Sequence, residues 1–117
     1  MKATLDPIWS IKDNAVVGII APGPWDAINP QNKNNWDKLN MKANEIGEQY
    51  VATMKKFADY YLLPFLDLYR QSGLRPWNPS FVVKYYHDTS DTDSTHPNTN
   101  GHRIFVPKIS VFVKKTV

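Results

Sequence analysis

Apolar residues recur every three or four positions through the middle of the chain, a spacing that places them on one face of an α-helix. The residues of this pattern are Trp36, Leu39, Ala43, Ile46, Tyr50, Met54, Phe57, Tyr61, Phe65 and Leu68. Pro64 interrupts the pattern, because proline lacks a backbone N–H and its ring clashes with the carbonyl of Tyr60. The pattern therefore predicts one long helix that is kinked, or broken into two consecutive helices, near residues 61–63.

Three other segments are rich in β-branched and aromatic residues and are bounded by polar, Pro or Gly residues, as strands usually are. They are residues 15–21, residues 81–87 and residues 103–114, which form one strand interrupted at Pro107 or two strands. This order of elements predicts an α+β fold. The long kinked helix, or two consecutive helices, is expected to pack on a small, mainly antiparallel sheet of three or four strands.

A polar stretch separates the second and third predicted strands. Residues 88–101 contain no aliphatic, Phe, Tyr or Trp residue. Hairpin loops usually have about 2–5 residues, and a longer polar loop in a small domain is either functional or disordered. The chain, residues 1–117, is therefore expected to form a single domain with a long polar hairpin loop at residues 88–101.

The composition limits the classes of protein to consider. With 42% apolar and 13% aromatic residues, the chain can bury a core and is expected to fold. It has no cysteine, which excludes disulfides, thiolate catalysis and cysteine-ligated zinc and favours a reducing compartment. The sequence shows neither a signal-peptide pattern nor an apolar run of membrane-spanning length. These features predict a cytoplasmic protein without a membrane segment.

The formal net charge is +3, and the excess of cations is concentrated near the end of the sequence, where residues 103–117 lack acidic residues. Tyr85 and Tyr86 lie on a neighbouring predicted strand. One hypothesis is therefore a single-stranded nucleic-acid-binding protein, in which rings stack on bases and cations contact phosphates. A structural role is the alternative, because lysines protect strand edges and aromatic pairs stabilise sheets. The predicted phosphate contacts are Arg103, Lys108, Lys114 and Lys115.

The three histidines, His87, His96 and His102, lie in or beside the polar stretch. With Asp91 and Asp93 they supply enough imidazole and carboxylate groups to bind zinc or another transition metal. Their spacing matches no compact metal-binding motif, and the Ser, Thr, Asp and Asn residues around them are also typical of solvated turns. Neither a nucleophile elbow nor a glycine-rich phosphate loop is present, and no cofactor is expected.

The order of several segments also resembles that of a known family. The matching segments are Leu63-Pro64-Phe65-Leu66, Gly73, residues 81–86, Ser94-Thr95-His96 and residues 104–106. They resemble the helix, turn, strand, ligand loop and returning strand of the phage-endolysin type of zinc D-Ala-D-Ala carboxypeptidase. The aspartate ligand that this family carries after the residue matched by His96 does not occur here, and neither does its later His-x-x-His pair. The resemblance therefore implies a degenerate zinc-peptidase scaffold without the activity.

Residues 60–66 are apolar or aromatic on nearly every side of a helix, so part of this segment is expected to lie in an interface. Tyr, Trp and Arg often supply the binding energy of interfaces. We therefore interpret the chain first as a small non-enzymatic binding or assembly protein that engages a protein partner or a second copy of itself. Its size and lack of cysteine favour an accessory protein of a phage or mobile element. The predicted contact residues, used together with the loop at residues 88–101, are Tyr60, Tyr61, Phe65, Tyr85, Tyr86 and His87.

Overall fold

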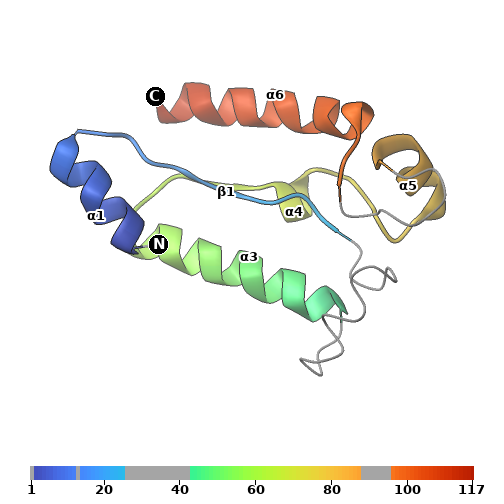
Figure 1. Ribbon diagram of the computed structural model, residues 1–117, viewed down its shortest axis with the longest axis horizontal. Coiled ribbons are helices and arrows are strands. Elements are labelled where there is room, and N and C mark those ends of the chain that lie inside the picture. The colour runs from blue at the N-terminus through green and yellow to red at the C-terminus, as the bar shows by residue number, and fades with distance from the viewer. Residues whose placement is uncertain (1, 13, 26–42, 88–95) are drawn as a thin grey trace.

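The computed structural model describes residues 2–12, 14–25, 43–87 and 96–117 of the chain, and most of these residues are helical. In chain order the elements are α1 (Lys2–Ile11), β1 (Ile19–Ala21), α3 (Ala43–Tyr60), β2 (Phe65–Asp67), α4 (Leu68–Gln71), α5 (Pro79–Tyr85) and α6 (Thr99–Thr116). The two strands lie between α6 and α3, with α1 at one end of the long axis and α5 at the other (Figure 1).

The sheet consists of two parallel strands, β1 and β2. The paired residues are Ile19 with Phe65, Ile20 with Leu66, and Ala21 with Asp67. Parallel neighbours need a crossover connection, and α3 lies in that connection. The predicted antiparallel sheet of three or four strands is therefore wrong for the described part of the chain. Of the three predicted strand segments, only residues 15–21 contain a strand, β1.

Residues 81–87, predicted as a strand, belong largely to the helix α5. Asn78 is the N-cap of this helix, and its side chain accepts a hydrogen bond from the backbone N–H of Ser80 at 3.0 Å. Pro79 follows at the start of the helix, where its missing N–H costs no helical hydrogen bond. These helix-start signals, together with the burial of Val82 in the core, outweigh the β-branched and aromatic residues that favoured a strand.

Residues 103–114, predicted as one interrupted strand or two strands, form most of the helix α6. Asn98 caps its start, because the Asn98 side chain accepts a backbone N–H of the first turn at 3.1 Å. Phe105 is buried. Phe112 packs closely on Gly18, since a Cβ added to Gly18 would lie 3.0 Å from the Phe112 ring. The two rings are seven residues apart, which places them on the same face of a helix. This helical spacing decides the structure of the segment against the alternating Ile and Val residues, which favoured a strand.

The polar stretch connects two helices instead of two strands. Residues 88–95 lie outside the described part of the chain, and Thr99 already belongs to the first turn of α6. The predicted loop therefore ends before residue 101, although an antiparallel bridge between Tyr86 and Pro97 brings its two ends together. The resemblance to the zinc D-Ala-D-Ala carboxypeptidase family required strands at residues 81–86 and 104–106. Because these segments belong to α5 and α6, the fold implied by that resemblance is also wrong.

The predicted long helix is replaced by α3, a turn and β2. Helix α3 ends at Tyr60, close to the predicted break, but no second helix begins at Pro64. A residue before proline is pushed toward an extended conformation, so Leu63 does not restart a helix. The chain instead leaves the turn as a strand, and the carbonyl of Pro64 accepts a hydrogen bond from the N–H of Ile19 at 2.9 Å. The start of the predicted helix, including Trp36 and Leu39, lies outside the described residues.

The inner face of α3 is displaced by one residue from the predicted face. Gly47, Val51 and Ala58 are buried, whereas Tyr50 is 59% exposed. Helix α3 packs against β1 and β2 and approaches α4 closely at Gly47. A Cβ at Gly47 would collide with the phenol ring of Tyr69. Two residues of the predicted face, Met54 and Phe57, are half-buried, so the large apolar residues gave the correct period and only part of the correct face.

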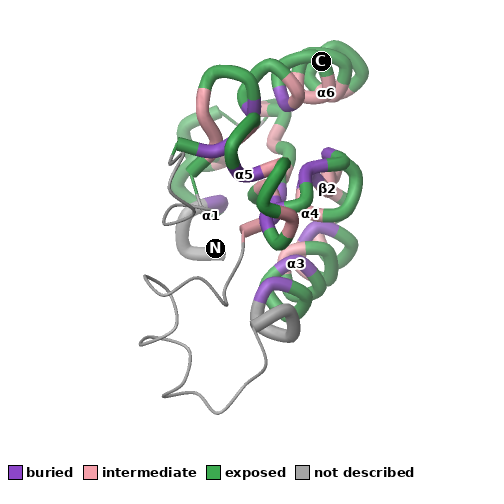
Figure 2. Tube along the Cα trace, turned by 90° about the vertical axis from the view of Figure 1, so that its right-hand side faces the viewer, coloured by how far each residue is buried: buried purple, intermediate pink, exposed green. Residues whose placement is uncertain are grey.

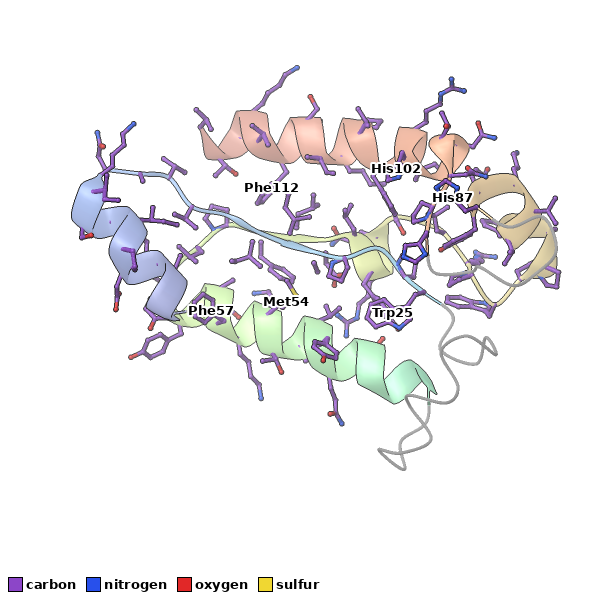
Figure 3. The ribbon with its side chains drawn as sticks, viewed as in Figure 1. Trp25, Met54, Phe57, His87, His102 and Phe112 are labelled. Carbon is purple, nitrogen blue, oxygen red and sulfur yellow. The ribbon has the colours of Figure 1, made fainter. Side chains whose placement is uncertain are left out.

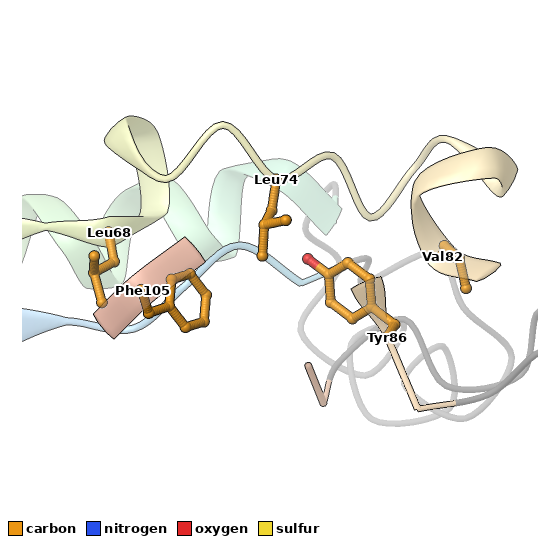
Figure 4. Close-up of a cluster of buried hydrophobic side chains, with 5 residues drawn as sticks. All are labelled: Leu68, Leu74, Val82, Tyr86 and Phe105. Atoms are coloured by element: carbon orange, nitrogen blue, oxygen red, sulfur yellow. The ribbon is translucent and has the colours of Figure 1, made fainter. Parts of the chain in front are cut away.

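A cluster of buried residues joins α4, α5, α6 and the segments between them. Its members are Leu68, Leu74, Val82, Tyr86 and Phe105 (Figure 4). Buried positions lie on the inner sides of the helices, while most of the outer surface of α3 and α6 is exposed (Figure 2). No helix among the described residues has both the length and the hydropathy to cross a membrane.

Candidate functional site

Helix α3 ends in a turn that holds Leu62 in an unusual backbone conformation. The N–H of Leu63 bonds to the carbonyl of Ala58 at 2.8 Å, and the N–H of Leu62 bonds to that of Asp59 at 3.2 Å. These are the two hydrogen bonds of a Schellman motif. The motif places Leu62 at φ 56°, in the left-handed region that usually takes glycine. Its side chain is 90% exposed, so packing within this chain does not offset the strain.

Three aromatic rings surround this turn. Tyr61 is half-buried, with its ring centroid 4.7 Å from that of Phe57 and 4.8 Å from that of Tyr60. Tyr60 is 80% exposed. We call Phe57, Tyr60, Tyr61 and Leu62 the aromatic corner, and Phe57 marks its place at the end of α3 (Figure 3). Contacts between the rings hold them in a fixed arrangement that leaves apolar surface exposed.

Charges of both signs border the aromatic corner. Lys55 and Asp59 form an ion pair on the exposed side of α3. The ammonium group of Lys55 also lies 5.8 Å from the ring centroid of Phe65, a half-buried residue of β2. Lys56 adds a second exposed cation next to this pair in the sequence. The border of the corner therefore contains both partners that an ion pair needs.

A second set of paired charges connects α3 with α4. Arg70 contacts the carboxylate of Asp67 at 3.0 Å and also pairs with Glu48 of α3. The hydrogen bond to Asp67 raises the pKa of Arg70. Burial raises the pKa of the neighbouring Tyr69 hydroxyl, and the negative charge of Glu48 raises it further. The cation and the two acids between α3 and α4 are thus paired with each other.

The junction between α5 and α6 is built from asparagine side chains. The Asn98 amide donates to the carbonyl of Tyr86 at 2.7 Å and to that of Lys84 at 3.2 Å. The Asn100 amide also donates to Lys84, at 3.3 Å. Gly101 lets the helices meet, since a Cβ there would collide with a backbone carbonyl of α5. The last carbonyls of a helix lack partners within it, so the asparagines both satisfy these groups and fix the junction.

Aromatic rings and cations lie together along α5. The ring centroids of Phe81 and Tyr85 are 5.4 Å apart. Arg75 lies 5.8 Å from the Phe81 ring and Lys84 lies 5.2 Å from the Tyr85 ring, within the range of cation–π interactions. Trp77, just before α5, is 63% exposed. We define the basic junction as these residues and the first cation of α6: Arg75, Trp77, Phe81, Lys84, Tyr85 and Arg103.

The C-terminal part of the described chain carries cations without acidic residues. Residues 68–87 and 96–117 contain seven cations and no Asp or Glu. Arg70 pairs with acids of β2 and α3, and the other six cations have no carboxylate partner among the described residues. These six are Arg75, Lys84, Arg103, Lys108, Lys114 and Lys115.

The predicted contact residues do not form one surface. Tyr60 and Tyr61 lie in the aromatic corner, whereas Tyr85 lies in the basic junction, at the other end of the molecule (Figure 1). Tyr86 is only 1% exposed, and its hydroxyl donates to the carbonyl of Pro24 at 2.8 Å. Tyr86 therefore belongs to the core. Tyr85 is the last residue of α5 and Tyr86 is its C-cap, so the two neighbouring side chains have different environments.

The predicted metal ligands do not come together in the described part of the chain. His87 and His96 are exposed and share a backbone hydrogen bond of 2.9 Å from the N–H of His87 to the carbonyl of His96. His102, on α6, is also exposed and lies at the same end of the molecule as His87 (Figure 3). Asp91 and Asp93 lie outside the described residues. Within those residues, no group of three or more His, Asp or Glu side chains is placed to hold a metal ion.

The four predicted phosphate contacts are spread along α6. Arg103 lies near the start of the helix, in the basic junction, and Lys108 is half-buried in the middle. Lys114 and Lys115 lie in the last turn, where cations favour the negative end of the helix dipole. An α-helix rises about 1.5 Å per residue, so Arg103 and Lys114 are about 16 Å apart along the axis. Of the four, Arg103 is the one that contacts Asn100, whose amide donates to the carbonyl of Lys84 in α5.

Six residues of these surfaces were not among the predicted site residues: Phe57, Leu62, Arg75, Trp77, Phe81 and Lys84. No local signal marks Leu62, because leucine rarely takes a positive φ. Arg75 and Trp77 stand before Asn78 and Pro79, a pair that often begins a helix. Reading that pair as a helix start would have placed both residues beside α5.

Comparison of the chain with protein-family models, curated proteins and solved structures found no match. Function is therefore inferred from the chemistry of the aromatic corner and the basic junction.

Proposed function

We propose that the protein is a binding and assembly protein that associates with a second copy of itself through the aromatic corner. The observation that carries this proposal is Leu62, whose apolar side chain is 90% exposed at a backbone position that favours glycine. A left-handed conformation costs a non-glycine residue about 1–2 kcal/mol. Glycine would remove this cost, so a contact outside the monomer accounts for the leucine.

The rings beside Leu62 support a protein contact. Tyr60 is 80% exposed and is held by the ring of Tyr61, so little side-chain freedom is lost when it is buried. Burying a leucine side chain contributes about 1.5–3 kcal/mol, which exceeds the backbone strain. In a two-fold contact both copies contribute, so the gain is counted twice.

The charges around the corner favour a second copy as the partner. A two-fold contact brings the same patch together with itself, so the charges on the patch must be self-complementary. Lys55, Lys56 and Asp59 supply cations and an anion that can pair across such an axis. The described residues of the basic junction include cations but no acidic residue, so they offer no self-complementary pair of this kind.

Sedimentation velocity over a range of protein concentrations tests this proposal. We expect a reversible dimer whose dissociation constant rises about tenfold or more in Leu62→Gly, since about 1.4 kcal/mol corresponds to a factor of ten. Tyr60→Ser is expected to weaken the dimer in the same direction. Circular dichroism should show that both variants keep the helical content of the wild type.

Tyr50→Ser is the matched control, because Tyr50 is another exposed tyrosine of α3 outside the aromatic corner. This variant should leave the dimer unchanged. A protein that stays monomeric at all concentrations, or a dimer that Leu62→Gly does not weaken, contradicts the proposal. The predicted lack of catalysis and the predicted origin in a phage or mobile element stay predictions.

A further inference from the structure

The described residues of the basic junction include three cations and no acidic residue, and the acids of the connection between α5 and α6, Asp88, Asp91 and Asp93, lie outside the described residues. Its three cations, Arg75, Lys84 and Arg103, have no carboxylate partner among the described residues. The aromatic corner differs, because its charges include an ion pair. Clustered like charges raise the local potential and attract an oppositely charged ligand. The charge pattern of the described residues therefore favours an anionic partner.

The three cations are held in place by their neighbours. Arg75 and Lys84 lie 5.8 and 5.2 Å from the ring centroids that they contact. The Nη1 atom of Arg103 lies 3.5 Å from the side-chain oxygen of Asn100, whose amide donates to the carbonyl of Lys84. Asn100 therefore connects Arg103 of α6 with α5, and the contacting rings of Phe81 and Tyr85 connect Arg75 with Lys84.

We propose that the basic junction binds single-stranded nucleic acid. Arg75, Lys84 and Arg103 contact its phosphates, and the exposed ring of Trp77 stacks against a base. The aromatic corner and the basic junction share no residue and lie at opposite ends of the molecule (Figure 1). This function is therefore separate from self-association.

The combination of rings and cations favours a single strand over other polyanions. An unpaired base offers a π face to a protein ring, whereas the bases of a duplex are covered by their neighbours. An acidic peptide would satisfy Arg75 and Lys84 but would give the exposed ring of Trp77 no planar partner. Binding that depends on both the cations and Trp77 is therefore specific to the proposed ligand.

Fluorescence anisotropy with a labelled oligothymidylate of about 12 nucleotides measures this binding. Affinity for single strands falls with salt by a logarithmic slope of about −0.7 per phosphate contacted, so three cations give about −2. We expect Arg75→Gln combined with Lys84→Gln to reduce the slope to about −0.7. Trp77→Ala should weaken binding about tenfold and leave the slope unchanged, whereas Trp77→Phe, which keeps a ring, should retain most of the affinity.

Lys114→Gln combined with Lys115→Gln is the matched control, because it removes the same net charge from the other end of α6. We expect this control to bind the oligonucleotide and to lose affinity when Trp77 is also replaced by alanine, as the wild type does. A duplex and a polyglutamate peptide of similar charge should bind more weakly than the single strand. The proposal is overturned by absence of binding at low salt, by equal losses in the two double variants, or by equal affinity for all three polyanions. Because these variants leave the aromatic corner intact, the dimer of the assembly proposal is tested independently.

Discussion

The aromatic corner and the basic junction satisfy their groups in opposite ways. At the corner, Lys55 pairs with Asp59, but Leu62 keeps a strained backbone and an exposed apolar side chain. At the junction, Asn98 and Asn100 satisfy the backbone carbonyls, but the cations lack acidic partners among the described residues. Among the described residues, the corner therefore leaves apolar surface uncovered, whereas the junction leaves cations without a carboxylate partner. The comparison shows how the unsatisfied groups of a surface indicate the chemistry of its ligand.

The two regions also differ in how closely they pack against the buried core. Phe81 and Tyr85 of the junction pack against the buried cluster that includes Val82, Tyr86 and Phe105, which Figure 4 shows. The corner projects from the end of α3, and its outermost residues, Tyr60 and Leu62, are mostly exposed. Substitutions behind the junction should therefore cost much more stability than substitutions at the corner.

The largest effect is expected for Tyr86→Ala. The side chain is only 1% exposed, so its removal leaves a cavity in the core. We expect the free energy of unfolding to fall by about 3–5 kcal/mol, measured by urea denaturation followed by circular dichroism. Tyr86→Phe keeps the ring and removes only the hydroxyl that donates to Pro24, so a smaller loss of about 1–2 kcal/mol is expected. If Tyr86→Ala kept the stability of the wild type, the proposed difference in packing between the two regions would be wrong.

An intermediate effect is expected for Asn98→Ala. This change removes the N-cap of α6 and the amide that donates to the carbonyls of Lys84 and Tyr86. We expect the free energy of unfolding to fall by about 1–2 kcal/mol in the same urea assay. Asn98→Asp keeps the acceptor for the N–H of Gly101 but loses both donors. If the aspartate variant matched the wild type, the two hydrogen bonds that the Asn98 amide donates to α5 and its C-cap would contribute nothing to stability.

The sequence allowed part of the fold to be predicted, and the errors have a physical cause. A repeat of apolar residues every three or four positions located α3, because many positions share the same repeat. The runs at 81–87 and 103–114 were assigned as strands because β-branched residues are common there. Tertiary packing overrides such preferences, and the caps at Asn78 and Asn98 were the local signals that indicated helices.

The candidate surfaces were less predictable than the helices. Tyr60 and Tyr61 were expected at an interface, and both lie in the aromatic corner. The adjacent residues Tyr85 and Tyr86 have opposite environments, which depend on where α5 ends. The positive φ of Leu62 and the contacts between α5 and α6 arise from tertiary structure, so no pattern in the sequence revealed them.

The smallest changes in stability are expected at two residues with a left-handed backbone conformation. Leu62 and Gly73 have φ values of 56° and 82°, both in the left-handed region. A Cβ at Gly73 would meet no atom within 4 Å, so substitution there tests backbone strain alone. We expect Leu62→Gly to raise the free energy of unfolding by about 0.5–1 kcal/mol and Gly73→Ala to lower it by about the same amount.

Urea denaturation at protein concentrations below the dimer dissociation constant measures both variants as monomers. Opposite signs would show that Leu62 costs the monomer stability, as expected of a residue retained for binding. If Leu62→Gly instead destabilised the monomer while Gly73→Ala behaved as expected, the leucine would be stabilising the fold through contacts of its own. In that case the exposure of Leu62 would no longer indicate a missing partner, and the aromatic corner would lose the observation that assigns it to self-association.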